Sequence, residues 1–193
     1  MAFKVVLDAN VLYPSSLRDT LLRLAHHELY DLALSERILD EATRNLVADQ
    51  RVDPAQAERL RRAIASVFPE AMVDPAAIAA IEPAMTNDPG DRHVLAAAVV
   101  SGAEGIVTFN ARDFPEAALA PFGKQRINPD DFLCTLLDID PLTVTESLIE
   151  QAGQLRRPPL TPAQLLDYLE RGRVTEFAGR VRELLIPPTE RDT

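Results

Sequence analysis

The sequence predicts an α/β fold, a mostly parallel sheet covered by helices, followed by an all-helical tail. Two observations predict it. Short apolar runs typical of buried strands alternate with segments whose apolar residues recur at helical spacing. Beyond residue 131 this alternation stops and only helical patterns follow. We therefore expect an α/β domain over residues 1–133 and a helical extension over residues 134–193.

The chain opens with a strand, a helix, a strand and a helix. The apolar run at residues 3–7 predicts a buried first strand that ends at Asp8. Ser16 then caps a segment with leucines at helical spacing. A second short strand is expected at residues 32–34, and Ser35 begins the helix that follows it.

The next segment is predicted to be helical because of its first residues. Asp53 is a favoured cap and Pro54 occupies the first helical position, so we expect a helix over residues 53–67 that Pro69 stops. Residues 71–73 are expected to form a third strand, and a short alanine-rich helix follows.

A nearly all-apolar helix is the strongest sign of a covered sheet. Residues 94–100 carry almost no polar side chain, so this helix must be buried, and Gly102 ends it. Strands are expected at residues 106–109 and 126–128. Parallel strands joined by helices are covered on both faces, which predicts a three-layer α/β/α arrangement.

The tail shows three helical patterns. They lie near residues 130–138, 142–154 and 162–186, and we expect the last one to break around Gly172.

Composition excludes several classes of protein. The chain has 193 residues, of which 47% are apolar, and this is typical of a packed globular protein rather than a disordered one. The single Cys134 excludes an internal disulfide and a thiolate metal cluster. No apolar run approaches the length of about 18 residues that a membrane span needs, and no signal peptide is visible. We expect a cytoplasmic protein that has no membrane partner.

The formal net charge of −10 bears on nucleic acid as a partner. A net negative field repels DNA and RNA, which argues against a non-specific nucleic-acid-binding protein. It does not exclude a nuclease whose carboxylates hold cations.

Four acids occupy positions at which an α/β sheet collects its ligands. Asp8 ends the first strand, Asp113 follows the fourth, and Asp91 begins the apolar helix. Glu41 flanks the apolar stripe of its own helix. Neighbouring carboxylates repel one another unless cations neutralise them, and a set of oxygen ligands favours Mg²⁺ or Mn²⁺. The pattern predicts metal-dependent phosphoryl transfer.

Four short motifs carry these acids. They read VVLDANV at residues 5–11, ILDEA at 38–42, DRHVLA at 91–96 and VTFNARDF at 107–114. In this order and spacing the chain resembles PIN-domain ribonucleases, and in particular VapC-type toxins of toxin–antitoxin pairs.

The resemblance implies a catalytic, metal-binding set of acids with polar residues beside it. The acids are Asp8, Glu41, Asp91 and Asp113, and the supporting residues are Asn10, Thr108 and Asn110. It also implies endonucleolytic cleavage of RNA with Mg²⁺ or Mn²⁺, a homodimer, and inhibition by a small cognate antitoxin protein. The tail resembles a helical extension that some members of the family carry.

Several residues that lie close to the four acids in the sequence have two possible roles. Asp88 lies three residues before Asp91, and either of them could cap the helix or bind metal. His93 could reach a substrate phosphate or pack in the core, and Tyr13 could line the cleft or pack. The arginines nearest the acids, which could contact phosphate or orient the ligands through salt bridges, are Arg18, Arg92 and Arg112.

Two other enzyme classes fit poorly and one non-enzymatic class stays open. A haloacid-dehalogenase-type phosphatase needs a second aspartate two positions after the first, where this chain has Asn10. A dinucleotide-binding fold needs a Gly-x-Gly-x-x-Gly turn after the first strand, and none follows it. A PIN-like module that binds RNA or protein with little or no turnover remains an alternative.

Overall fold

The chain folds into two compact units. The computed structural model describes residues 3–154 and 160–185. We call residues 1–13 with 30–128 the sheet unit, and residues 14–29 with 129–193 the helical unit. The expected boundary after residue 133 falls inside a helix, Pro129–Ile139, and the two units divide the chain before that helix. As a domain boundary, the division at residue 133 stays a prediction.

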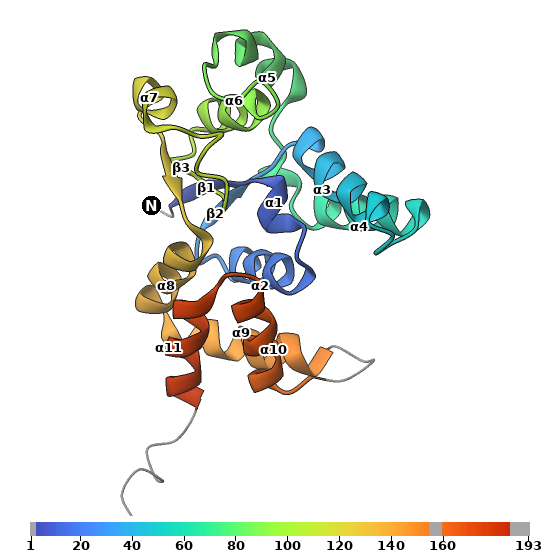
Figure 1. Ribbon diagram of the computed structural model, residues 1–193, viewed down its shortest axis with the longest axis vertical. Coiled ribbons are helices and arrows are strands. Elements are labelled where there is room, and N and C mark those ends of the chain that lie inside the picture. Colours follow the sequence, from blue (N-terminus) through green and yellow to red (C-terminus); the bar gives the residue numbers. More distant parts are fainter. Residues whose placement is uncertain (1–2, 155–159, 186–193) are drawn as a thin grey trace, which may run out of the picture. The chain divides into compact units, whose positions relative to one another are not determined.

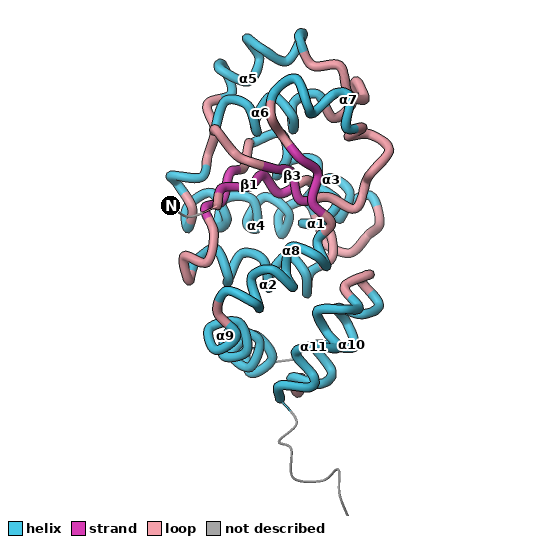
Figure 2. Tube along the Cα trace, turned by 90° about the vertical axis from the view of Figure 1, so that its left-hand side faces the viewer, coloured by secondary structure: helices cyan, strands magenta, loops and turns pink. Residues whose placement is uncertain are grey.

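Four parallel strands form the centre of the sheet unit, in the order β2-β1-β3-β4 (Figures 1 and 2). In the register, Val6 of β1 lies opposite Ala33 of β2 and Ile106 of β3. The two central strands are therefore β1 and β3, and their carboxyl ends lie at one edge of the sheet. The strands are β1 (Lys4–Leu7), β2 (Asp31–Ala33), β3 (Gly105–Val107) and β4 (Gln125–Ile127).

Helices complete the sheet unit. They are α1 (Ala9–Leu12), α3 (Glu36–Ala48), α4 (Pro54–Val67), α5 (Pro75–Ile81), α6 (Arg92–Ser101) and α7 (Glu116–Leu119). Short 3₁₀ turns connect them at η1 (Pro69–Ala71), η2 (Glu82–Ala84) and η3 (Ala120–Phe122). Helix α6 packs against β1, β2 and β3, and α5 lies beside it (Figure 1).

Local sequence signals explain where these helices begin and end. Asp53 and Gln56 form a reciprocal capping box at the start of α4, as the Asp-Pro pair predicts. Gly102 ends α6 with a φ of 70°, in the left-handed region that glycine adopts without strain. Residues 93–98 of α6 are all buried, which agrees with the apolar pattern of that helix. The α/β class is therefore confirmed.

The prediction of a three-residue strand at residues 71–73 is wrong, because the structure forms only one residue pair there. Only Met72 is in strand conformation, as a single parallel bridge to Leu34. The 3₁₀ turn η1 ends immediately before it, and Pro75 begins α5 three residues later, with Asp74 as the cap. Pro69 and Pro75 lie on either side of this segment and begin helical turns, so only one residue pair between them can form strand hydrogen bonds.

The helical unit contains no strand within its described residues. Its helices are α2 (Ser15–His26), α8 (Pro129–Ile139), α9 (Pro141–Gln154), α10 (Pro162–Arg171) and α11 (Thr175–Leu185). The break expected around Gly172 is confirmed, with Arg173 at a φ of 70° between α10 and α11. Residue 186, the expected end of the last helix, lies outside the described residues. Within the described residues no helix is long and apolar enough to cross a membrane.

A buried glutamine joins α2 to the C-terminal helices. Gln151 of α9 is 1% exposed; its Oε1 accepts a hydrogen bond from Thr20 Oγ1 at 2.8 Å, and its Nε2 donates to the Ser16 carbonyl at 3.0 Å. Because a buried amide is costly unless it is hydrogen-bonded, this pairing specifies one position of α2 against α9. An early helix thus belongs to the same unit as the tail.

A second helix-to-helix contact caps α11. The carboxylate of Asp130, in α8, accepts hydrogen bonds from the backbone N–H groups of Thr175, Glu176 and Phe177 at 2.8 to 2.9 Å. These three donors lack partners within their own helix, so a negative charge at this end stabilises it.

Removing this cap should destabilise the helical unit. We expect Asp130→Ala to lower the free energy of unfolding by about 2 kcal/mol, because three N–H groups lose a charged acceptor. Thermal and urea unfolding of the purified variant measure the change. Asp131→Ala is the matched control, since Asp131 is exposed on the same helix. Equal stability of the two variants would contradict the capping role.

Candidate active site

Four acids lie around the carboxyl edge of the sheet unit. Asp8 directly follows β1, and its backbone N–H donates to the Val107 carbonyl at the end of β3. Asp113 lies in the loop after β3, Asp91 begins α6, and Glu41 lies on α3. The charges of Asp8, Glu41 and Asp113 all act on Asp91, so the structure brings the four predicted acids into one electrostatic cluster.

Asp8 is the most buried of these acids. It is 3% exposed, and its Oδ2 accepts hydrogen bonds from Thr108 Oγ1 at 2.7 Å and from Asn10 Nδ2 at 2.5 Å. Burial raises the pKa of Asp8, while the hydrogen bond from Thr108 opposes the rise. The two donors hold this oxygen, and with it the carboxylate, in one orientation.

The supporting polar residues form one network across the ends of β1 and β3. Asn10 donates to Thr108 Oγ1 at 2.8 Å and accepts from the Phe109 N–H at 3.2 Å. The Asn110 N–H donates to Thr108 Oγ1 at 2.9 Å. The N–H groups of Phe109 and Asn110 thus donate to side chains instead of to a neighbouring strand. For this reason β3 ends at Val107 and not at the expected Phe109. The network fixes the position of Asp8.

Asp113 is oriented by Asn110 and by the loop before α6. Asn110 Nδ2 donates a hydrogen bond to Asp113 Oδ2, and the Asp88 N–H donates to the Asp113 carbonyl at 3.3 Å. The side chain of Asp113 lies close enough to that of Asp91 for its charge to raise the pKa of Asp91.

Asp91 carries the most strongly perturbed carboxyl group of the cluster. Burial first, and then the charges of Asp8, Glu41 and Asp113, raise its pKa from 3.8 to about 7. It stands at the N-cap of α6 without making a side-chain cap hydrogen bond, so its carboxylate faces the other acids instead. The exposed Asp88 closes a turn by accepting from the Gly90 N–H at 2.9 Å.

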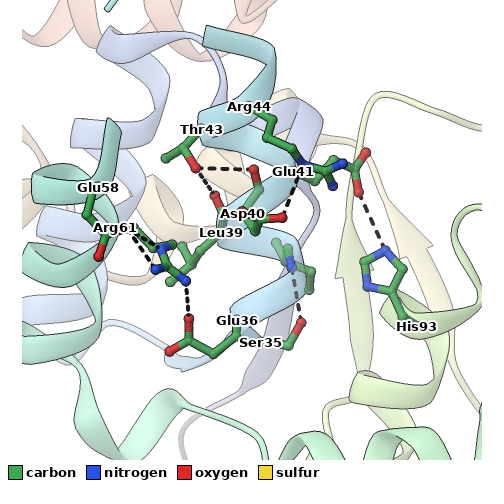
Figure 3. Close-up of polar contacts among 11 residues, drawn as sticks. Ser35, Glu36, Leu39, Asp40, Glu41, Thr43, Arg44, Glu58, Arg61 and His93 are labelled. Carbon is green, nitrogen blue, oxygen red and sulfur yellow. Dashed lines mark hydrogen bonds and ion pairs between the residues drawn. The ribbon is translucent and has the colours of Figure 1, made fainter. Parts of the chain in front are cut away.

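Glu41 projects from α3 toward α6 (Figure 3). Its side chain is 33% exposed, and its Oε2 lies 3.5 Å from Nε2 of His93. The neighbouring Asp40 is instead paired with Arg44 on its own helix at 3.1 Å. Consecutive helical residues point about 100° apart, which explains why only one of these two acids belongs to the cluster.

The sequence left the role of His93 open. The structure places it 1% exposed beside the acids, and ligand atoms of Glu41, Asp91 and His93 all lie within 4.8 Å of one another. Its position two residues after Asp91 was the only signal in the sequence, and burial cannot be read from that spacing.

The residues of this cluster fit a divalent cation. Burial and neighbouring acids raise the pKa of Asp8 and of Asp91, so a positive charge beside them would stabilise their ionised forms. Carboxylate oxygens are the ligands that Mg²⁺ and Mn²⁺ prefer, and three possible ligand atoms lie within 4.8 Å of one another.

A small open pocket adjoins the cluster at Asn10. Its volume is about 280 Å³, and it is lined by Asn10, Tyr13, Asn45, Ala48 and Asp49. The Tyr13 hydroxyl donates a hydrogen bond to Asp49 Oδ2, so Tyr13 lines this pocket rather than packing in the core. Arg112, by contrast, is an exposed residue of the loop after β3.

Comparison with known proteins identifies the family. Residues 4–112 match the family model described as PIN domain. The chain belongs to the PIN-domain family. Residues 129–183 match the model described as VapC50 C-terminal domain, which corresponds to most of the helical tail. The resemblance to VapC-type PIN proteins with a C-terminal extension is thus confirmed.

One curated protein is also similar in sequence to this chain. It is the "Putative ribonuclease VapC50" of Mycobacterium tuberculosis, which is 43% identical over 101 residues. The matched segment covers 52% of this chain and 59% of the relative. No solved structure matches the chain. The functional roles of the individual acids in this chain remain predictions that rest on their geometry.

The raised pKa of Asp91 predicts how stability depends on pH without metal. The folded chain binds this proton more tightly than the unfolded chain, so stability falls as pH rises from about 4 to about 7. Asp91→Asn removes the charge, so we expect it to raise the melting temperature in chelator more at pH 8 than at pH 5.

Melting curves of the wild type and of Asp91→Asn at the two pH values measure this difference. Asp88→Asn is the control, because Asp88 is exposed and bonded within its own turn. An equal effect of Asp91→Asn at both pH values would contradict the coupling among the acids.

Proposed function

We propose that this PIN-domain protein is a divalent-metal-dependent endoribonuclease and the toxin of a toxin–antitoxin pair. The observation that carries the proposal is the cluster of Asp8, Glu41, Asp91 and Asp113 at the carboxyl edge of the sheet. Membership of the PIN-domain family, and a relative whose name describes a ribonuclease, support RNA as the substrate.

The acids would hold Mg²⁺ or Mn²⁺ against the scissile phosphodiester. A bound ion lowers the pKa of an attacking water and offsets the charge that develops on the leaving oxygen. Asp8 keeps a fixed orientation because Thr108 and Asn10 both donate to the same oxygen. Asn110 orients Asp113 in the same way. Preorganised ligands of this kind need no rearrangement when the RNA binds.

Asp91 would give up its proton when the ion binds. Its pKa of about 7 means that the metal-free group is partly protonated near neutral pH, and a cation among the acids favours the ionised form. Metal affinity should therefore rise with pH through neutrality, which couples the loading of the site to the ionisation of Asp91.

The same cluster suggests the chemistry of the protein partner. A chain with a net charge of −10 and four clustered acids attracts a basic segment. An arginine of that segment could form bidentate hydrogen bonds with a carboxylate of the cluster. We propose a small basic antitoxin as this partner and a homodimer as the active assembly, in the cytoplasm. Purification from native expression tests the partner: a bound protein without a basic segment would contradict it.

Cleavage by purified protein tests the proposed nuclease. We expect discrete cuts in structured RNA with Mn²⁺ or Mg²⁺, none with chelator, and loss of more than about 99% of the cleavage rate in Asp8→Asn. The substitution removes a ligand charge but little volume. Mapping of cut ends by sequencing, with 5′-phosphates expected, measures the outcome.

Asp40→Asn is the matched control for this loss. It removes one carboxylate from the same protein, but Asp40 is paired with Arg44 outside the cluster, so cleavage should be retained. Unchanged cleavage in Asp8→Asn would contradict the site. Bound metal with RNA held but never cut would favour the alternative, a PIN-like module with little or no turnover.

A further inference from the structure

His93 has no assigned role in the proposed chemistry, although its environment is unusual. The side chain is 1% exposed, and neither Nδ1 nor Nε2 has a hydrogen-bond partner within the described residues. A buried imidazole without hydrogen bonds costs free energy, because its ring nitrogens lose their hydrogen bonds to water. Such a residue is retained more readily where a ligand satisfies it.

The ring faces the acids rather than the core. Figure 3 shows the ring of His93 directed at Glu41, with Nε2 at 3.5 Å from Glu41 Oε2. This separation exceeds an ordinary charge-assisted hydrogen bond of about 2.8 Å. It agrees with two ligands of one ion, because atoms each about 2.1 Å from a metal lie about 3 to 4 Å apart.

Asp91 completes the arrangement. A carboxylate oxygen of Asp91 lies within 4.8 Å of the ligand atoms of both Glu41 and His93. Asp91 is the N-cap residue of α6, His93 lies in the first turn of that helix, and Glu41 approaches from α3, so two elements of the sheet unit bring the three donors together.

We propose that Nε2 of His93 is a ligand of the divalent cation that Glu41 and Asp91 bind. The centre is then a mixed set of nitrogen and oxygen donors instead of carboxylates alone. This inference rests on the metal centre of the proposed function, but it does not depend on whether RNA is cleaved there.

A nitrogen ligand changes which ion the site prefers. Mg²⁺ strongly favours oxygen donors, whereas imidazole is a good ligand for first-row transition metals. The wild-type centre should therefore bind Mn²⁺ more tightly than Mg²⁺. Replacing the imidazole by an amide should reduce this preference by about tenfold while the acids still hold either ion.

Pulsed electron paramagnetic resonance of Mn²⁺ bound to the purified full chain tests the ligand directly. We expect modulation from a coordinated ¹⁴N nucleus in the wild type, replaced by the ¹⁵N pattern when histidine is isotopically labelled. His93→Gln should lose the modulation, and titrations with Mn²⁺ and Mg²⁺ should show the smaller preference. His27→Gln is the control, because His27 is an exposed histidine, and it should keep both properties.

The outcomes separate this inference from the proposed function. Mn²⁺ that binds wild type without ¹⁴N modulation, or modulation that survives in His93→Gln, overturns the ligand role of His93. No Mn²⁺ binding at all overturns both the centre and the inference. Histidine modulation in a protein that cleaves no RNA sustains the ligand role while contradicting the nuclease. If His93→Gln fails to fold, modulation that persists in the His27→Gln and His26→Gln variants of labelled protein decides the assignment.

Discussion

Repulsion among partly buried carboxylates is the constraint on which the rest of the site depends. Asp8 is almost fully buried, and Asp91 is pushed to a pKa of about 7 by burial and by three other acids. Such a cluster opposes folding unless a proton or a cation offsets its charge. The sheet unit keeps the acids together all the same, through hydrogen bonds from Thr108 and Asn10 to Asp8 and from Asn110 to Asp113.

The sheet order explains how residues far apart in sequence meet. Strands β1 and β3 are central neighbours, so the residues that follow them share one edge, and α6 packs across the same strands with its first turn beside that edge. Short strands are an advantage here, because β3 ends where Thr108 must turn its hydroxyl toward Asp8. The geometry is the one expected for ligand sites of parallel sheets, outside the carboxyl ends of the strands.

Much of this arrangement could be predicted from the sequence, and the exceptions have physical reasons. Asp8 and the start of α6 follow from local patterns, since apolar runs and caps act over a few residues. The grouping of α2 with the C-terminal helices could not be predicted, because amphipathic spacing shows that a face is buried but not against what. His93 was left open for the same reason: it is buried beside Glu41 without a hydrogen-bond partner among the described residues, which only tertiary structure reveals.

We propose that the acids around the carboxyl edge of the sheet form one divalent-cation centre. Anomalous diffraction from crystals of the full chain grown with Mn²⁺ tests it most directly, because the metal is located independently of any activity. We expect an anomalous peak within coordinating distance of Asp8, Asp91 and Glu41, which disappears when the crystal is soaked in chelator. A well-ordered site without such a peak at millimolar Mn²⁺, or a peak elsewhere on the chain alone, would contradict it.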